Sequence, residues 1–561
     1  MRSTPGERAW LAAAFAVAAL VALPLGALLW TAVQGSAGLW SHLAAHVLPQ
    51  ATWNTVLLLV GVAAVAVPVG TICAWLVSAY DFPGRRLFGW ALLLPLAVPT
   101  YIVAFAYLDL SHPLGPLQTG LRALLGYDSP RDFRLPDLRS LPACIVLLGL
   151  VLYPYVYLTV RAMFALQAAS LVEAARSLGV GGAALFVRVA LPLARPAIAV
   201  GTALVLLETL NDIGASEFLG VKTLTVAVYT TWVTRSDLPG AAQIALAMLA
   251  VVILALALER FGRRRQRYAG GGRARPLVPQ RLRGGPALLA TIACAIPVLL
   301  GFVAPAAHLA VEALERLRGE GISPQLWASA GNTLRIAAFA TMATLVAALV
   351  LVWGARLANA RRRGVVAGLA LRVGSLGYAL PGTVLAIALL APAGVVDRVL
   401  FSLSEGTPLL MGSLTLLVLA CTIRFLAIAT GGLEAGLARI PPSLDQAARG
   451  LGAGPTASLW RVHLPLLRPA LAAAAMLVFV DAMKELPATL MLRPLSVDTL
   501  ATWLYAEAAR GTYEEGAVAA LLIVLAGLPA VVLLARSGFD AGPAPAPATP
   551  PASASEPRLS P

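Results

Sequence analysis

Two groups of ionisable side chains lie in segments that are otherwise apolar. Glu208 and Asp212 are four residues apart and share one face of a helix, and Asp481, Lys484 and Glu485 repeat that arrangement. An ionisable residue inside a membrane costs roughly 2.5–3.5 kcal/mol, so such residues usually face a cavity or pair with one another. Carboxylates are hard oxygen donors that suit a hard cation. We therefore expect a polar path for a solute, with Lys484 placed to pair with Asp481.

The two groups belong to stretches that correspond to each other in sequence. Residues 208–214 read Glu-Thr-Leu-Asn-Asp-Ile-Gly and residues 481–487 read Asp-Ala-Met-Lys-Glu-Leu-Pro, at a separation of 273 (481 − 208 = 273). Asn211 adds a further polar group to the first stretch. An alternative is that these side chains lie at the water boundary and only cap helices, because Gly214 and Pro487 are close by.

The composition determines which elements can position these groups. Of 561 residues, 59% are hydrophobic and 12% are charged, whereas soluble domains carry about 25% charged residues. Several apolar runs exceed the ~18 residues typical of a membrane-spanning helix. A lipid-exposed backbone must satisfy its own hydrogen bonds, and runs of this length exclude a β-barrel. The chain is therefore predicted to be an all-α polytopic membrane protein in a lipid bilayer.

Twelve spans are expected, in two parallel repeats of six. The expected spans lie near 10–33, 52–79, 88–110, 142–164, 195–213 and 241–258, then near 286–311, 331–357, 365–391, 409–430, 469–492 and 515–535. The domains expected are a first unit 1–258, a basic linker 259–285, a second unit 286–536 and a disordered Pro/Ala-rich tail 537–561.

The arginines predict the orientation. With the N-terminus in the cytoplasm, Arg85-Arg86, the linker and Arg361-Arg362-Arg363 all fall on the cytoplasmic side, as the C-terminus does. The net charge of +15 is then explained by cytoplasmic helix ends, and no nucleic-acid partner is expected.

A polar loop also occurs twice, again at a separation of 273 (446 − 173 = 273). Ser170 precedes Glu173 by three residues, and Ser443 precedes Gln446 by three, which is the spacing of a capping box. A short helix should therefore begin at each serine.

Glycine and proline predict where these short helices end. Gly179 and Gly452 suit a left-handed stop. A second short amphipathic helix should follow in each loop and end at Pro192 or Pro465.

Each loop resembles the Glu-Ala-Ala ("EAA") loop of ABC importer membrane subunits, with Glu-Ala-Ala, then Gly, then Leu-Pro. In that family the loop docks in the cytoplasm into a cleft on the ATPase subunit. The resemblance implies docking through Glu173, Ala174, Ala175, Gly179, Pro192, Gln446, Ala447, Ala448, Gly452 and Pro465. The second loop departs from the family pattern, with Gln446 in place of glutamate and Asp445 one position earlier. The alternative is a capped turn without a partner.

The sequences 208–214 and 484–494 look like those of the ferric-iron group of ABC permeases, in which two permease units are fused. The resemblance implies a bacterial inner-membrane permease that translocates ferric iron, a periplasmic binding protein that delivers it, and a separate ATPase dimer that binds ATP and Mg. Related fused permeases carry thiamine, polyamines or phosphonates, and these cargoes remain alternatives.

Other chemistry is not indicated. The sequence has no Gly-x-x-x-x-Gly-Lys-Ser/Thr loop, and neither of its two lysines, Lys222 and Lys484, follows such a loop, so this chain is not expected to bind ATP or to be an enzyme. The five histidines and four cysteines are scattered, and no metal role is assigned to them. An ion-driven secondary carrier and a membrane-embedded enzyme are the more remote alternatives.

Overall fold

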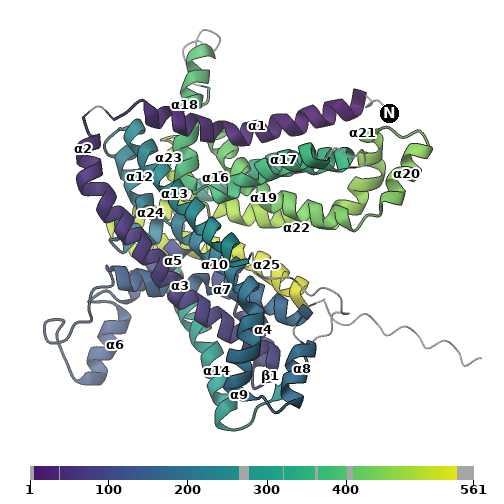
Figure 1. The fold of residues 1–561 in the computed structure, drawn as a ribbon. Helices are drawn as coiled ribbons and strands as arrows, with labels where there is room; N and C mark the ends of the chain where they lie inside the picture. Colours follow the sequence, from purple (N-terminus) through teal and green to yellow (C-terminus); the bar gives the residue numbers. More distant parts are fainter. Residues whose placement is uncertain are drawn as a thin grey trace, which may run out of the picture.

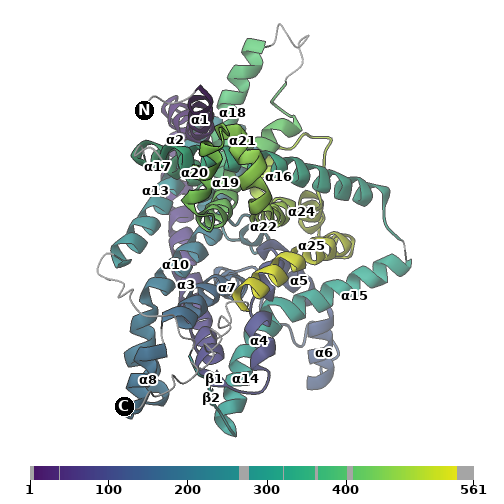
Figure 2. The same cartoon turned by 90° about the vertical axis from the view of Figure 1, so that its right-hand side faces the viewer.

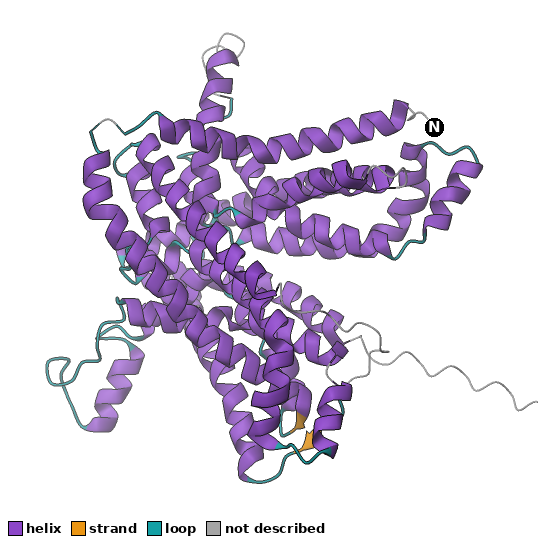
Figure 3. Cartoon of the chain, in the orientation of Figure 1, coloured by secondary structure: helices purple, strands orange, loops and turns teal. Residues whose placement is uncertain are grey.

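The part of the chain that the structure describes is mostly helical (Figure 3), as the composition predicts. The computed structural model describes residues 5–36, 38–167, 169–263, 277–319, 321–359, 364–400 and 409–539. Within these residues, eleven helices are long and apolar enough to cross a membrane, or up to twelve if a pair bent by 90° counts as one span. The expected all-α polytopic architecture is confirmed.

The elements of the first half are α1 (Pro5–Val33), α2 (Trp40–His42), η1 (Leu43–Val47), α3 (Leu48–Ala79), β1 (Tyr80–Asp81), α4 (Arg85–Ala91), η2 (Leu94–Ala97), α5 (Thr100–Leu110), α6 (Pro116–Leu125), α7 (Leu141–Gln167), α8 (Ala169–Ser177), α9 (Gly182–Leu185), η3 (Phe186–Ala190), α10 (Leu191–Asn211), α11 (Gly214–Phe218), α12 (Leu224–Val233) and α13 (Leu238–Arg263).

The elements of the second half are β2 (Gln280–Arg281), α14 (Gly285–Val298), η4 (Leu299–Val303), α15 (Ala304–Gly319), α16 (Pro324–Asn359), α17 (Gly364–Gly374), η5 (Ser375–Ala379), α18 (Gly382–Leu400), α19 (Leu414–Ala438), α20 (Pro442–Gly450), α21 (Pro455–Ser458), η6 (Leu459–His463), α22 (Leu464–Met483), α23 (Pro487–Leu492), α24 (Leu500–Arg510) and α25 (Tyr513–Phe539).

The third span of each half is interrupted where the sequence predicted a continuous helix. In the first half, α4 and the 3-10 turn η2 end before Pro99, and α5 begins at Thr100 after the 90° bend. In the second half, η5 ends before Pro381 and α18 begins at Gly382. Proline has no amide hydrogen to donate, so each helix is broken at that position. A broken helix at membrane depth is tolerated where it lines a cavity.

The two halves exchange their first spans. Helix α1 packs on α16, α17 and α18 of the second half, and the α14–η4–α15 span packs on α3, α5 and α7 of the first half (Figures 1 and 2). The two large apolar cores therefore each contain residues of both halves. One core contains Tyr153 of the first half and Cys294 of the second, and the other contains Met248 of the first half and Cys421 of the second. The predicted units 1–258 and 286–536 therefore each contribute residues to both cores.

The structure describes the two ends of the predicted linker 259–285. Helix α13 continues to Arg263, residues 264–276 lie outside the described residues, and β2 pairs in parallel with β1 in the register Tyr80–Gln280 and Asp81–Arg281. The predicted tail begins within α25, which runs to Phe539, and the rest of that tail also lies outside the described residues.

The two predicted docking helices lie on well-separated arms of the molecule. In Figure 1, α20 is at the tip of the upper arm and α8 at the tip of the lower arm, and the view in Figure 2 separates them as well. Away from these tips, the start of α5, the end of α10 and the start of α23 line one cavity. This arrangement places α8 and α20 far from each other, at opposite ends of the molecule.

Candidate translocation cavity and docking loops

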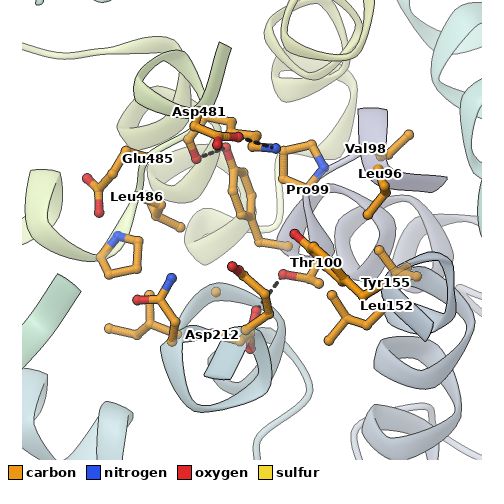
Figure 4. A pocket seen from close by; sticks show the side chains of 18 of the residues that line it. Leu96, Val98, Pro99, Thr100, Leu152, Tyr155, Asp212, Asp481, Glu485 and Leu486 are labelled. Carbon is orange, nitrogen blue, oxygen red and sulfur yellow. Dashed lines mark hydrogen bonds and ion pairs between the residues drawn. The ribbon is translucent and has the colours of Figure 1, made fainter. Parts of the chain in front are cut away.

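A cavity with an empty volume of about 840 Å³ lies where the two halves meet. Its lining comes from the broken third spans, from α7 and α19, and from the ends of α10 and α22. All six residues expected to line a path are part of this lining: Glu208, Asn211, Asp212, Asp481, Lys484 and Glu485. The structure thus brings the two sequence groups together into one site, part of which Figure 4 shows.

Asp212 forms hydrogen bonds to the helices around it. Its Oδ1 accepts a hydrogen bond from the Thr100 hydroxyl at 2.6 Å, which Figure 4 shows as a dashed line. Its Oδ2 accepts from the amide and the hydroxyl of Ser216, at 2.8 and 2.9 Å. This buried carboxylate therefore caps α11 and ties it to the broken third span. At this position the side chain both lines the cavity and caps a helix.

Glu485, 273 residues later, does the same in the second half. Its two oxygens accept from the backbone amides of Ala488 and Thr489, at 2.8 and 2.9 Å, at the start of α23. Arg424 from α19 donates to Oε1 at 2.8 Å. The Glu485 side chain is 1% exposed and that of Arg424 12%, so this is a buried ion pair.

Two polar residues at the end of α10 hold the interrupted span of the opposite half. Glu208 Oε1 accepts from the Tyr378 hydroxyl at 2.9 Å, and Asn211 Oδ1 accepts from the backbone amide of Gly382 at 2.9 Å. A Cβ on Gly382 would lie against the Arg424 guanidinium, which would have to shift and disturb its pair with Glu485. The end of α10 in one half therefore contacts the start of α18 in the other.

The expected pair between Lys484 and Asp481 is formed, with 2.8 Å between Nζ and Oδ1. Both side chains are only partly buried, at 28% and 29% exposure. Asp481 corresponds to Glu208 in the repeat, and Glu208 interacts electrostatically with Arg424, Asp481 and Lys484. The lining contains four carboxylates and two basic groups, so its formal net charge is −2 (2 − 4).

Among the lining residues that sequence reasoning missed, three bond to the expected ones. Arg424 lies in the middle of the apolar run 409–430, so the rule that selected Glu208 would also have selected it. Thr100 and Tyr378 each lie next to a break in a third span, and Pro99 and Pro381 were the available signals for those breaks.

The docking loops end their first helix as expected. Gly179 and Gly452 have φ angles of +81° and +78°. The amides of Val180 and Ala453 donate to the carbonyls of Ala175 and Ala448, five residues back, at 3.0 and 2.9 Å. These are two copies of a Schellman stop, which favours glycine at the left-handed position. Nothing lies within 4 Å of a Cβ at either glycine, so the positive φ is the reason for glycine there.

The exposed apolar side chains of the two loops occur at equivalent positions. Leu178 and Leu451 are 83% and 89% exposed, and Val187 and Trp460 are 57% and 60% exposed. Both pairs are 273 residues apart, like Leu171 and Leu444, which are also exposed. Single exposed apolar residues need no explanation, but here they recur in register on both loops.

Two details of the expected loop structure are wrong. Helix α20 begins at Pro442, and its N-cap residue Pro441 has no side-chain cap bond, so Ser443 lies inside the first turn and forms no capping box. The expected cap at Ser170 stays a prediction, because residue 168 and the Ser170 side chain lie outside the described residues. Proline at the first helical position is favourable, which moves the start of α20 to Pro442.

Pro192 and Pro465 do not end a helix either. Each lies in the first turn of a long helix, α10 or α22, and follows a π-helical turn, η3 or η6. The chain runs as one helix from Gly182 to Asn211. A π turn shifts the hydrogen-bond register locally, and this lets the helix continue past the missing proline amide hydrogen.

The two loops are attached to the body differently. In the second loop, Asp445 contacts Arg356 Nη2 and His463 Nε2, both at 2.7 Å. The equivalent positions of Asp445 and His463 in the first loop are Val172 and Ala190, both fully buried. The charge of Asp445 is therefore neutralised within the protein, and it does not replace the glutamate that the second loop lacks at Gln446.

Comparison with known proteins agrees with these features. The chain matches the family "binding-protein-dependent transport system inner membrane component" twice, over residues 66–268 and 350–540, together more than half of its length. It is 28% identical to the Fe(3+)-transport system permease protein FbpB 2 of Haemophilus influenzae over 87% of this chain and 89% of that protein. It is also 28% identical to the molybdenum transport system permease protein ModB of Escherichia coli, over 40% of this chain and 99% of that protein.

Among solved structures, a chain of a bacterial alginate ABC transporter in complex with an alginate-bound periplasmic protein matches with a TM-score of 0.36 and 16% identity, over 44% of this chain and 92% of that chain. The family match rests on the two sequence segments, one in each half. The chain therefore belongs to the family of inner membrane components of binding-protein-dependent transport systems: it is a multi-pass ABC permease subunit with two fused permease units, and it does not itself hydrolyse ATP.

Proposed function

We propose that this chain is the permease of a ferric iron importer in the bacterial inner membrane. A periplasmic binding protein delivers the iron to the face opposite α8 and α20, and the central cavity passes it between the two halves. Helices α8 and α20 each dock on one subunit of a separate ATPase dimer in the cytoplasm, where both termini also lie. ATP and Mg are bound by that dimer.

The support for docking is the paired set of exposed apolar side chains on the two loops. Leu178 and Leu451 are the most exposed of these, and each lies next to the glycine that ends its helix. The alanines that follow Glu173 and Gln446 are small, which permits close approach of a partner. Closure of the ATPase dimer would move α8 and α20 towards each other. The two halves would then move as rigid bodies about the cavity.

The support for a cationic cargo is the acidic lining. Glu208 and Asp481 occupy equivalent positions in the two halves and are not used as helix caps, unlike Asp212 and Glu485. Their oxygens suit a hard cation such as ferric iron. Similarity to an Fe(3+)-transport permease over most of both chains supports the same cargo.

The test is reconstitution of this chain in proteoliposomes with its ATPase and binding protein. We expect no ATPase activity from the purified chain, activity when the ATPase is added, and uptake of radioactive ferric iron only with all three components. Uptake that survives ATP depletion but stops with a protonophore would instead favour an ion-driven carrier.

An oxyanion is the second candidate cargo. Lys484 and Arg424 are both in the lining, and a molybdenum permease is among the relatives. Competition for uptake by molybdate or a phosphonate, with no effect of ferric iron, would establish this alternative. Competition by thiamine or a polyamine alone would exclude both proposals.

A further inference from the structure

Outside the cavity, one buried histidine joins two spans that are far apart in sequence. His308 on α15 and Asp109 near the end of α5 approach to 2.9 Å between Nε2 and Oδ2. The His308 side chain is 6% exposed and that of Asp109 22%. The sequence separation of 199 residues explains why the histidines seemed scattered before the fold was known.

A second carboxylate completes the cluster. Glu312, one turn after His308 on the same helix, places Oε1 3.9 Å from Nδ1 of the imidazole, and its side chain is 19% exposed. One ligand atom each from Asp109, His308 and Glu312 can be chosen so that all three lie within 4.8 Å of one another. This is the spacing from which a metal ion can draw three ligands after small side-chain rotations.

The surroundings of the cluster are acidic. Glu312 is exposed to the negative charges of Asp109, Glu315 and Glu514 and to the single imidazole of His308. A cation at this position would offset that repulsion. On the same helix, Arg316 lies one turn after Glu312, and Arg318 lies in the last turn.

The repeat does not account for the cluster. The first span of the other half, α1, contains no histidine, and its one acidic residue is Glu7, in the first turn. None of the three cluster residues is part of the cavity lining.

We propose that Asp109, His308 and Glu312 bind one divalent transition-metal ion, of the Zn²⁺ or Mn²⁺ class. One imidazole nitrogen and two carboxylates suit such borderline ions and leave positions for water. The ion would link α5 of the first half to α15, which belongs to the first span of the second half. It is a resident structural ion and not the cargo.

The test uses the purified full-length chain, stripped with a chelator and dialysed against Zn²⁺. We expect one tightly bound Zn²⁺ per chain by elemental analysis, and visible absorption bands when Co²⁺ is used in its place. His308→Ala and Glu312→Gln should each weaken Zn²⁺ binding by at least about tenfold, because each removes a ligand.

The matched control is His112→Ala, an exposed histidine just beyond the end of α5, which should bind Zn²⁺ as the unaltered chain does. The Glu312→Gln variant keeps the His308–Asp109 contact intact, so it remains informative if His308→Ala does not fold. No stoichiometric Zn²⁺ or Co²⁺ in the unaltered chain, or equal binding by Glu312→Gln, would overturn the proposal and leave a plain His–Asp pair.

Discussion

Replacing Arg424 with methionine should lower the free energy of unfolding by about 3–5 kcal/mol, because it leaves the buried Glu485 carboxylate without its counter-charge. The two groups are 2.8 Å apart, and Glu485 is 1% exposed. Glu485 cannot swing out to water without giving up its bonds to the amides of Ala488 and Thr489. The full penalty of an unpaired buried charge therefore applies.

The expected change in Tm follows from the size of the chain. With an unfolding entropy of about 2.1 cal/mol/K per residue over 561 residues, the loss corresponds to roughly 3–4 °C. The assay is a thermal melt with a thiol-reactive fluorophore, which reports unfolding because Cys73, Cys144, Cys294 and Cys421 are all buried.

Two comparisons make this prediction specific. Arg493→Met removes a pair with Asp498 whose side chains are 25% and 41% exposed, and should cost at most about 1 kcal/mol. Adding Glu485→Gln to Arg424→Met removes the uncompensated charge and should recover much of the lost Tm. If Arg424→Met melts like Arg493→Met, or if the double variant is less stable than Arg424→Met, the reasoning about this pair is refuted.

Three further predictions concern the loops and the contact between the halves. Gly179→Val with Gly452→Val should strain both left-handed stops by about 1–2 kcal/mol each and abolish ATP-driven uptake; unchanged uptake would contradict their role. Leu178→Ser with Leu451→Ser should weaken binding of the ATPase, measured by co-purification, with no more than about 0.5 kcal/mol change in stability. Glu217 accepts a hydrogen bond from a tyrosine of α24, and burial raises the pKa of its carboxyl. The stability that protonated Glu217 contributes is therefore fully present below its ordinary pKa of 4.5 and is lost as the pH rises through the raised pKa. Melts of Glu217→Gln across pH should lack this fall, and identical pH profiles would refute it.

The architecture could be predicted because its causes are local or periodic. Span length depends on runs of apolar residues, and the 273-residue repeat is visible directly in the sequence. The stops at Gly179 and Gly452 depend on a conformation that favours glycine. The expected pair of Lys484 with Asp481 followed from helix spacing alone, and it is present.

The parts that were missed depend on contacts between distant segments. The metal cluster requires α15 to pack against α5, which follows from the exchange of first spans and has no sequence signal. The hydrogen bond of Asn211 to Gly382 likewise crosses between halves. The start of α20 was misplaced because both Pro442 and Ser443 are good first-turn residues, and the spacing Ser443–Gln446 favoured a later start.

The most direct test of the account is the sidedness of the two loops. Single cysteines at Ser177→Cys and Gly450→Cys, which are exposed equivalents at the ends of α8 and α20, would be treated with a membrane-impermeant thiol reagent. The account predicts that both react in inside-out vesicles, that neither reacts in right-side-out vesicles, and that the bound ATPase protects both. Reaction of the two cysteines from opposite sides of the membrane would contradict it.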